Sequence, residues 1–123
     1  MIGSDSGSGV APLPRQWLIW WVVVRVAGPS MSPTLKHGDR LLVRRLRPGS
    51  AVRSGVVVVA RFPAGPDRLV IKRVRRGLDG GVWVEGDNSL VTDDSRSFGP
   101  AVAVGRAVLR LWPRPGRLPA APG

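Results

Sequence analysis

Residues 56–75, VVVVARFPAGPDRLVIKRVR, decide the fold class of this 123-residue chain. Two runs rich in β-branched residues flank a short segment that contains two prolines and a glycine. Such runs, bounded by turn residues, are typical of β-strands. Proline or glycine also interrupts nearly every other window, so no segment shows a convincing helical period. The sequence therefore predicts a mostly-β domain.

The same pattern extends outward on both sides of this stretch. A glycine-rich turn at residues 77–81 predicts a hairpin. Residues 15–112 are predicted to form one domain, between flexible tails at residues 1–14 and at the proline-rich residues 113–123. The predicted strands lie near residues 20–27, 40–45, 56–62, 68–75, 81–85 and 102–111.

The composition excludes several kinds of site. The chain has no cysteine, which excludes disulfides, thiol nucleophiles and cysteine zinc sites. His37 is its one histidine, which argues against a histidine metal centre, and it lies in a polar turn where we expect it to be solvated. We therefore expect neither a metal nor a cofactor.

The N-terminal region carries no evident membrane span. Its longest apolar run, residues 17–24, has eight residues, whereas a spanning helix needs about 20. The first 14 residues lack the positively charged start of a signal peptide. We therefore expect a cytoplasmic protein, with tryptophans and arginines available for peripheral contact with a membrane.

Three segments differ from ordinary β-domain sequence, and the first is residues 28–35, GPSMSPTL. Pro29 and Pro33 lie on both sides of Ser30 and stiffen the backbone. A serine held in this way can present its hydroxyl at a fixed angle, as a nucleophile requires. On spacing alone, a proline-rich turn with incidental serines remains an alternative.

The second segment places a lysine, Lys72, inside an apolar strand. Lysine occurs only twice among the 19 basic residues. Burial among Leu69, Val70, Ile71 and Val74 should lower the pKa of Lys72, whereas an arginine would keep its proton. A neutral lysine can accept the proton of a serine hydroxyl. The alternative is a surface-facing residue on a half-buried strand.

The third segment, residues 85–100, holds four of the eight acidic residues. Its Asp, Asn, Ser and Thr side chains can fix the loop backbone by local hydrogen bonds, so we expect an ordered loop. Asp94 and Arg96 could form an ion pair that staples the loop. The spacing and the closing glutamate of a calcium-binding EF-hand are absent, which argues against a calcium site.

Together, in this order over about residues 22–108, these segments resemble the type I signal peptidase family of serine endopeptidases with a Ser/Lys dyad. The resemblance implies a signal-peptidase/LexA-like domain of coiled antiparallel sheets. It implies Ser30 as the nucleophile and Lys72 as the general base. It further implies that the Thr92 hydroxyl orients the lysine and that Asp94 and Arg96 support the site structurally.

The resemblance also implies how substrate is bound. Some members carry a serine oxyanion donor where this chain has Gly28, so the oxyanion hole must rely on backbone amides, including that of Ser30. Met31 is a candidate wall of the substrate pocket. The partner would be a precursor polypeptide bound in an extended conformation. Short chains of this kind are most similar to the maturation proteases of nickel-type superoxide dismutase, which remove an N-terminal extension.

Other functions stay open at this point. Secretory processing of exported proteins is the alternative within the peptidase interpretation. A basic nucleic-acid-binding β-domain is another, because a net charge of +11 could bind phosphates. The scattered arginines and the absence of tyrosine argue against it, so no nucleic-acid partner is expected. A non-catalytic membrane-surface module is the third.

Overall fold

In the computed structural model, which describes residues 20–47 and 49–122, the valine-rich runs form an antiparallel β-sheet of seven strands. The mostly-β fold predicted from the sequence is confirmed. The predicted N-terminal tail lies outside the described residues. The elements are β1 (Trp21–Arg25), β2 (Arg40–Arg45), β3 (Val57–Phe62), β4 (Gly65–Leu78), β5 (Gly81–Glu85), the one-turn helix α2 (Ser95–Phe98), β6 (Val102–Trp112) and β7 (Gly116–Arg117).

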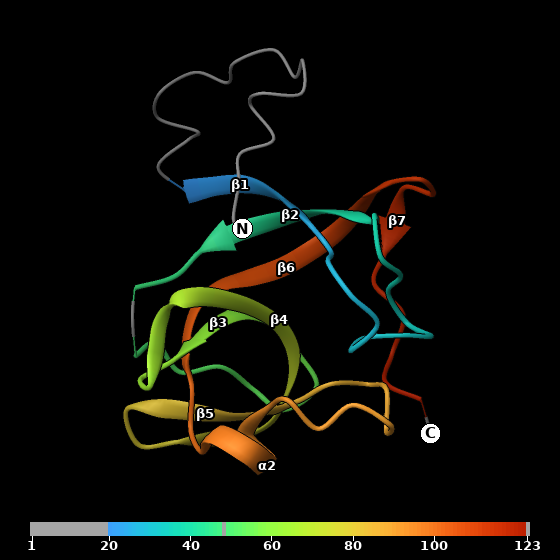
Figure 1. Ribbon diagram of the computed structural model, residues 1–123. Coiled ribbons are helices and arrows are strands. Elements are labelled where there is room, and N and C mark those ends of the chain that lie inside the picture. The colour runs from blue at the N-terminus through green and yellow to red at the C-terminus, as the bar shows by residue number, and fades with distance from the viewer. Residues whose placement is uncertain (1–19, 48, 123) are drawn as a thin grey trace.

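The sheet is strongly coiled. Its strand order is β1-β2-β6-β3-β4-β5, with β7 paired to β6. The long strand β6 connects two halves, the upper with β1, β2 and β7 and the lower with β3, β4 and β5 (Figure 1). Register shifts in the pairing of β6 with both β2 and β3 mark irregularities at this connection. Such bulges bend a strand, which fits the coiling of the sheet.

Strand β3 separates two hydrophobic cores. Val57 and Val59 belong to a first cluster with β1, β2 and the loop after β1, whereas Val58, Ala60 and Phe62 belong to a second cluster with β4 and β5. Because β3 is buried on both faces, its sequence is a continuous apolar run rather than an alternating one. Each fully buried valine stabilises the fold by about 1.5–3 kcal/mol relative to an exposed one.

Two features differ from the predicted elements. Strand β4 begins at Gly65, earlier than expected, and continues to the predicted hairpin, where Leu78 pairs with Gly81. The loop after β5 contains the single helical turn α2, capped by the side chain of Asp94. None of the helices in the described ranges is long and apolar enough to cross a membrane.

The C-terminal segment also differs from the flexible tail that the prolines suggested. Strand β7 pairs with β6, where Arg117 lies opposite Leu109. The carbonyl oxygen of Pro119 accepts a hydrogen bond of 3.2 Å from the guanidinium of Arg73. The two residues of β7 carry no strand signal of their own, and Arg73 lies 46 positions from Pro119, so the local composition could not reveal these contacts.

Candidate active site

The candidate site is a cavity between two unpaired strand edges. Among the described residues, β1 pairs only with β2, and β4 before Arg73 pairs only with β3. A cavity of about 640 Å³ lies between these edges, lined by residues 24–31 on one side and residues 67–72 on the other. An extended polypeptide can add to such edges as a further strand.

Ser30 lies in the irregular loop that follows β1, half-buried at the wall of this cavity. Backbone hydrogen bonds from Ser32 to Pro29 and from Leu35 to Met31, each 3.0 Å long, fold the loop into consecutive turns. Met31 and Leu35 insert into the first hydrophobic cluster and are 1% and 0% exposed. Val26, before Ser30, is 2% exposed in the same cluster, so the loop is anchored on both sides of Ser30. Met31 is among the residues that line the cavity.

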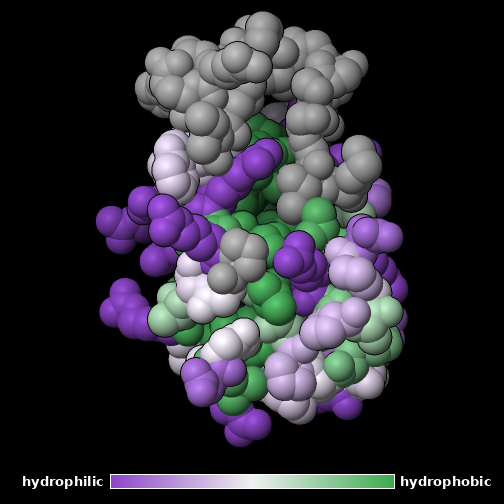
Figure 2. Space-filling model, turned by 90° about the vertical axis from the view of Figure 1, so that its left-hand side faces the viewer, coloured by the Kyte–Doolittle hydropathy of each residue, from purple (hydrophilic) through white to green (hydrophobic). Residues whose placement is uncertain are grey.

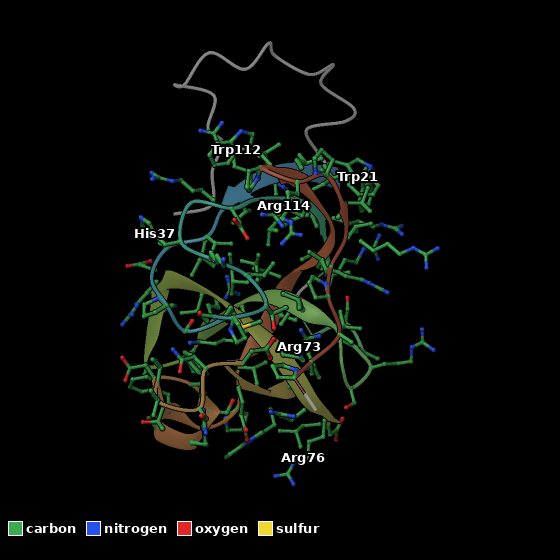
Figure 3. All side chains as sticks on the ribbon, turned by 90° about the vertical axis from the view of Figure 1, so that its right-hand side faces the viewer. Trp21, His37, Arg73, Arg76, Trp112 and Arg114 are labelled. Atoms are coloured by element: carbon green, nitrogen blue, oxygen red, sulfur yellow. The ribbon has the colours of Figure 1, made fainter. Side chains whose placement is uncertain are left out.

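Gly28 and His37 hold the start of this loop. Gly28 adopts a φ of +81°, in the left-handed region that favours glycine. Its amide donates a hydrogen bond of 3.0 Å to Nδ1 of His37. Nδ1 must be unprotonated to accept this bond. His37 lies on a peripheral loop (Figure 3), but it is a partner of the loop that carries Ser30 rather than only a solvated side chain.

Lys72 is 3% exposed and lines the same cavity as Ser30. It pairs with Val58, and strand alternation places it on the face of β4 that carries Val70 and Val74 in the second cluster. Leu69 and Ile71 pack against the first cluster, so they contribute less to its burial than the sequence suggested. Burial lowers the pKa of Lys72 below its ordinary value of 10.5, although the negative charges of Asp94 and Asp93 oppose this shift.

Asp94 and Arg96 form the ion pair that the sequence suggested. Asp94 is fully buried, and its carboxylate accepts hydrogen bonds from the amides of Gly86 and Arg96 and from the Arg96 guanidinium, the shortest at 2.6 Å. Burial opposes ionisation of Asp94, but these hydrogen bonds outweigh it and hold its pKa below 3.8. A fixed negative charge therefore lies close enough to Lys72 to influence its pKa.

The loop after β5 packs directly on the backbone of the candidate nucleophile. The amide of Asn88 donates a hydrogen bond of 2.9 Å to the carbonyl oxygen of Ser30, and its side-chain amide donates one of 3.1 Å to the carbonyl of Pro29. A Cβ atom on Gly86 would lie 2.5 Å from the Ser30 carbonyl oxygen. Only glycine fits at position 86 without displacing Ser30.

A second buried ion pair, between Arg73 and Asp87, was missed in the sequence. The Arg73 guanidinium donates to Asp87 at 2.8 Å and 2.9 Å and to the carbonyl of Gly55 at 2.8 Å. The two side chains are 5% and 0% exposed. The signal was available in part: Arg73 follows Lys72 in a strand, so it points to the opposite, buried face, where a charge requires a partner.

The expected hydrogen bond between Thr92 and Lys72 is not present among the described residues. It is exposed, and its carbonyl oxygen accepts a hydrogen bond of 2.6 Å from the Ser97 hydroxyl. Within residues 20–47 and 49–122, no hydrogen bond joins the Thr92 hydroxyl to Lys72. Its neighbour Asp93, which the sequence did not single out, does line the cavity. The orienting role of Thr92 stays a prediction.

Comparisons with known proteins identify the family of the chain. Residues 4–105 match the family described as Peptidase S24-like. The chain is 37% identical to mitochondrial inner membrane protease subunit 1 of Xenopus tropicalis, over 74% of this chain and 69% of that protein. It is 38% identical to mitochondrial ATP-independent inner membrane protease subunit 1a of Arabidopsis thaliana, over 72% and 68%. These relatives support signal-peptidase-like processing of proteins, and the chain belongs to the Peptidase S24-like family.

Proposed function

We propose that this protein is a serine endopeptidase in which Ser30 is the nucleophile and Lys72 is the general base. The observation that carries the proposal is the burial of Lys72 in the wall of the cavity that Ser30 also lines. Burial lowers the pKa of Lys72, and a lysine that can lose its proton more readily is the kind of group that can take the proton of a serine hydroxyl.

In the proposed reaction, neutral Lys72 accepts the Ser30 hydroxyl proton while Oγ attacks the carbonyl carbon of the substrate peptide bond. The tetrahedral intermediate collapses to an acyl-enzyme, and the Lys72 ammonium donates its proton to the departing amine. Lys72 then accepts a proton from the water that hydrolyses the ester, and returns it to Ser30 Oγ.

The surroundings support the remaining tasks of a peptidase. The amide of Ser30 is a candidate oxyanion donor, and a hole made of backbone amides needs the loop to stay fixed. Hydrogen bonds to His37 and Asn88 provide this fixation. The unpaired edges of β1 and β4 suit a precursor polypeptide in an extended conformation.

Two classes of precursor are candidates. The likeness to inner membrane protease subunits favours processing at a membrane, and the comparisons lend no support to the expected cytoplasmic location. Removal of the N-terminal extension of nickel-type superoxide dismutase is the narrower candidate, and it rests on the resemblance found in the sequence. Incubation of the purified protein with each precursor, followed by sequencing of the new N-termini, distinguishes the two.

Substitution of Lys72 tests the mechanism. Lys72→Arg preserves the charge but cannot act as a base, so we expect it to be inactive at every pH, as is Ser30→Ala. Lys72→Met is a second inactive variant that needs no buried charge, and thermal unfolding should show it at least as stable as the wild type. Wild-type kcat/KM should fall in acid as Lys72 becomes protonated, with an apparent pKa below 10.5.

Peptide cleavage is measured across a pH series for all four proteins. Their folding is compared by circular dichroism, so that loss of activity is not confused with loss of structure. Activity of a folded Lys72→Arg variant would show that Lys72 is not the base and would overturn the mechanism.

A further inference from the structure

A second, smaller pocket opens beside the candidate site. Its volume is about 140 Å³, and its apolar walls are Phe62, Ala64, Gly65, Val70 and Phe98. It therefore lies between the β3–β4 turn and helix α2, and the catalytic proposal does not use it. The rings of Phe62 and Phe98 lie 5.2 Å apart and are tilted by 50°.

The pocket borders the cavity that Ser30 and Lys72 line. Three residues line both spaces: Arg68, Val70 and Asp93. The β3–β4 turn lies on the left-hand side of Figure 1, and Figure 2 views this side face-on. Apolar surface is exposed there in a strip between hydrophilic side chains. A chain bound in the cavity therefore passes the mouth of the pocket.

Strand geometry fixes the distance between the pocket and the reacting bond. Val70 lies two residues before Lys72 on the same face of β4, which corresponds to roughly 7 Å along the strand. A substrate extended along β4 advances by the same rise per residue. The side chain that reaches the pocket therefore belongs to a residue about two positions from the cleaved bond.

Size and lining indicate which side chain fits. An apolar cavity of about 150 Å³ lined by aliphatic and aromatic groups accepts benzene. A phenyl ring would also meet the tilted pair of Phe62 and Phe98, and aromatic rings favour such edge-to-face contacts. Phe98 is 47% exposed, so its ring is available to a ligand.

We propose that this pocket is a specificity subsite that receives the phenyl side chain of a substrate residue two positions from the cleaved bond. This inference rests on the proposed peptidase function. The residues that determine the preference are Phe98 and Gly65, which both line the pocket. A Cβ on Gly65 meets no atom within 4 Å, so a larger side chain can be placed at this edge of the pocket without displacing the backbone.

The test uses peptides that carry phenylalanine or alanine at each of three positions on either side of the bond that the protein cleaves. The wild type should prefer phenylalanine at one position, two residues from the bond, by about tenfold or more in kcat/KM. Gly65→Leu and Phe98→Ala should each reduce this preference below about threefold. Trp112→Ala, which removes an exposed ring at the opposite end of the sheet, should keep the preference. A preference that survives in both pocket variants would overturn the proposal.

A binding measurement separates this proposal from the catalytic one. N-acetyl-phenylalaninamide is titrated into the Ser30→Ala protein, and amide chemical shifts are followed by NMR. Shifts at Gly65 and Phe98 that disappear in the Gly65→Leu background support the pocket, even if no peptide is cleaved and the proposed function fails. Absence of shifts at these residues overturns the pocket, whatever the hydrolysis shows.

Discussion

Two buried aspartates, one near each end of the same loop, hold arginines in different ways. Asp87 pairs with Arg73 of β4, whose guanidinium also reaches the carbonyls of Gly55 and Pro119. Asp94 pairs with Arg96, only two residues away and 34% exposed at its side chain. The first pair therefore joins distant parts of the fold, whereas the second shapes the loop locally and sets the charge near Lys72. This difference predicts that the first pair governs stability and the second the pH dependence of activity.

The largest effect is expected for Asp87→Ala. It leaves the Arg73 guanidinium buried without its counter-charge, which costs about 3–5 kcal/mol in the free energy of unfolding. Urea unfolding at neutral pH measures this loss.

Burial opposes ionisation of Asp87, but Arg73 and Thr34 hold its folded pKa below 3.8. Its contribution is therefore present above pH 3.8 and is lost as the pH falls through the folded pKa, so wild type and variant should converge in acid. If the Asp87→Ala variant were as stable as the wild type at neutral pH, the Arg73–Asp87 pair would not govern stability, and the proposed difference from the Asp94–Arg96 pair would be wrong.

Asp94→Asn should shift the pH dependence of activity and reduce stability less than Asp87→Ala does. The amide can still accept the Gly86 hydrogen bond, so the cost in stability is smaller, about 1–3 kcal/mol. Asp94 raises the pKa of Lys72, so its neutralisation should lower that pKa further. The acid limb of the kcat/KM profile should therefore move to lower pH. The same substitution at Asp87 is the control, and an equal displacement there would remove the distinction between the pairs.

Arg96→Gln should move the same limb in the opposite direction. The positive charge of Arg96 lowers the pKa of Lys72, so its removal should raise that pKa and shift the acid limb to higher pH. The buried Asp94 carboxylate loses its counter-charge but keeps the hydrogen bonds from the amides of Gly86 and residue 96, so the loss of stability should be about 1–3 kcal/mol, smaller than for Asp87→Ala. The pH–rate profile and thermal unfolding check both statements. A limb displaced to lower pH would contradict this account of the charges around Lys72.

Thr92→Val should give the smallest effect. If its hydroxyl orients Lys72 in the substrate complex, the loss of one hydrogen bond of about 0.5–1.5 kcal/mol should reduce kcat roughly two- to tenfold. Stability should change little, because Thr92 is exposed. A matched Thr92→Ser variant should keep full activity. Equal rates for wild type and Thr92→Val would remove Thr92 from the site.

The sequence predicted the parts of the molecule that depend on local patterns. Apolar runs bounded by turn residues gave six of the strands, and the short spacing between Asp94 and Arg96 suggested their ion pair. The early start of β4 was missed because Gly65 and Pro66 read as turn residues, although Gly65 pairs with Phe62.

Parts that depend on tertiary contacts could not be predicted. Strand β7 exists because the nearby end of β6 provides an edge for it, and its own two residues carry no strand signal. Arg73 and Asp87 are 14 residues apart, and only the fold brings them together. The Gly28–His37 hydrogen bond similarly depends on how the loop closes, which the sequence alone does not specify.

The hydrogen bond from Asn88 to the Ser30 carbonyl has a consequence for biosynthesis. During translation, Ser30 and Lys72 leave the ribosome before residues 86–96 that brace them. Until then Lys72 is solvated and, with an unperturbed pKa near 10.4, protonated. If Ser30 and Lys72 act as proposed, the nascent chain therefore carries both groups in an inactive form until residues 86–96, and after them β6, have left the ribosome and packed.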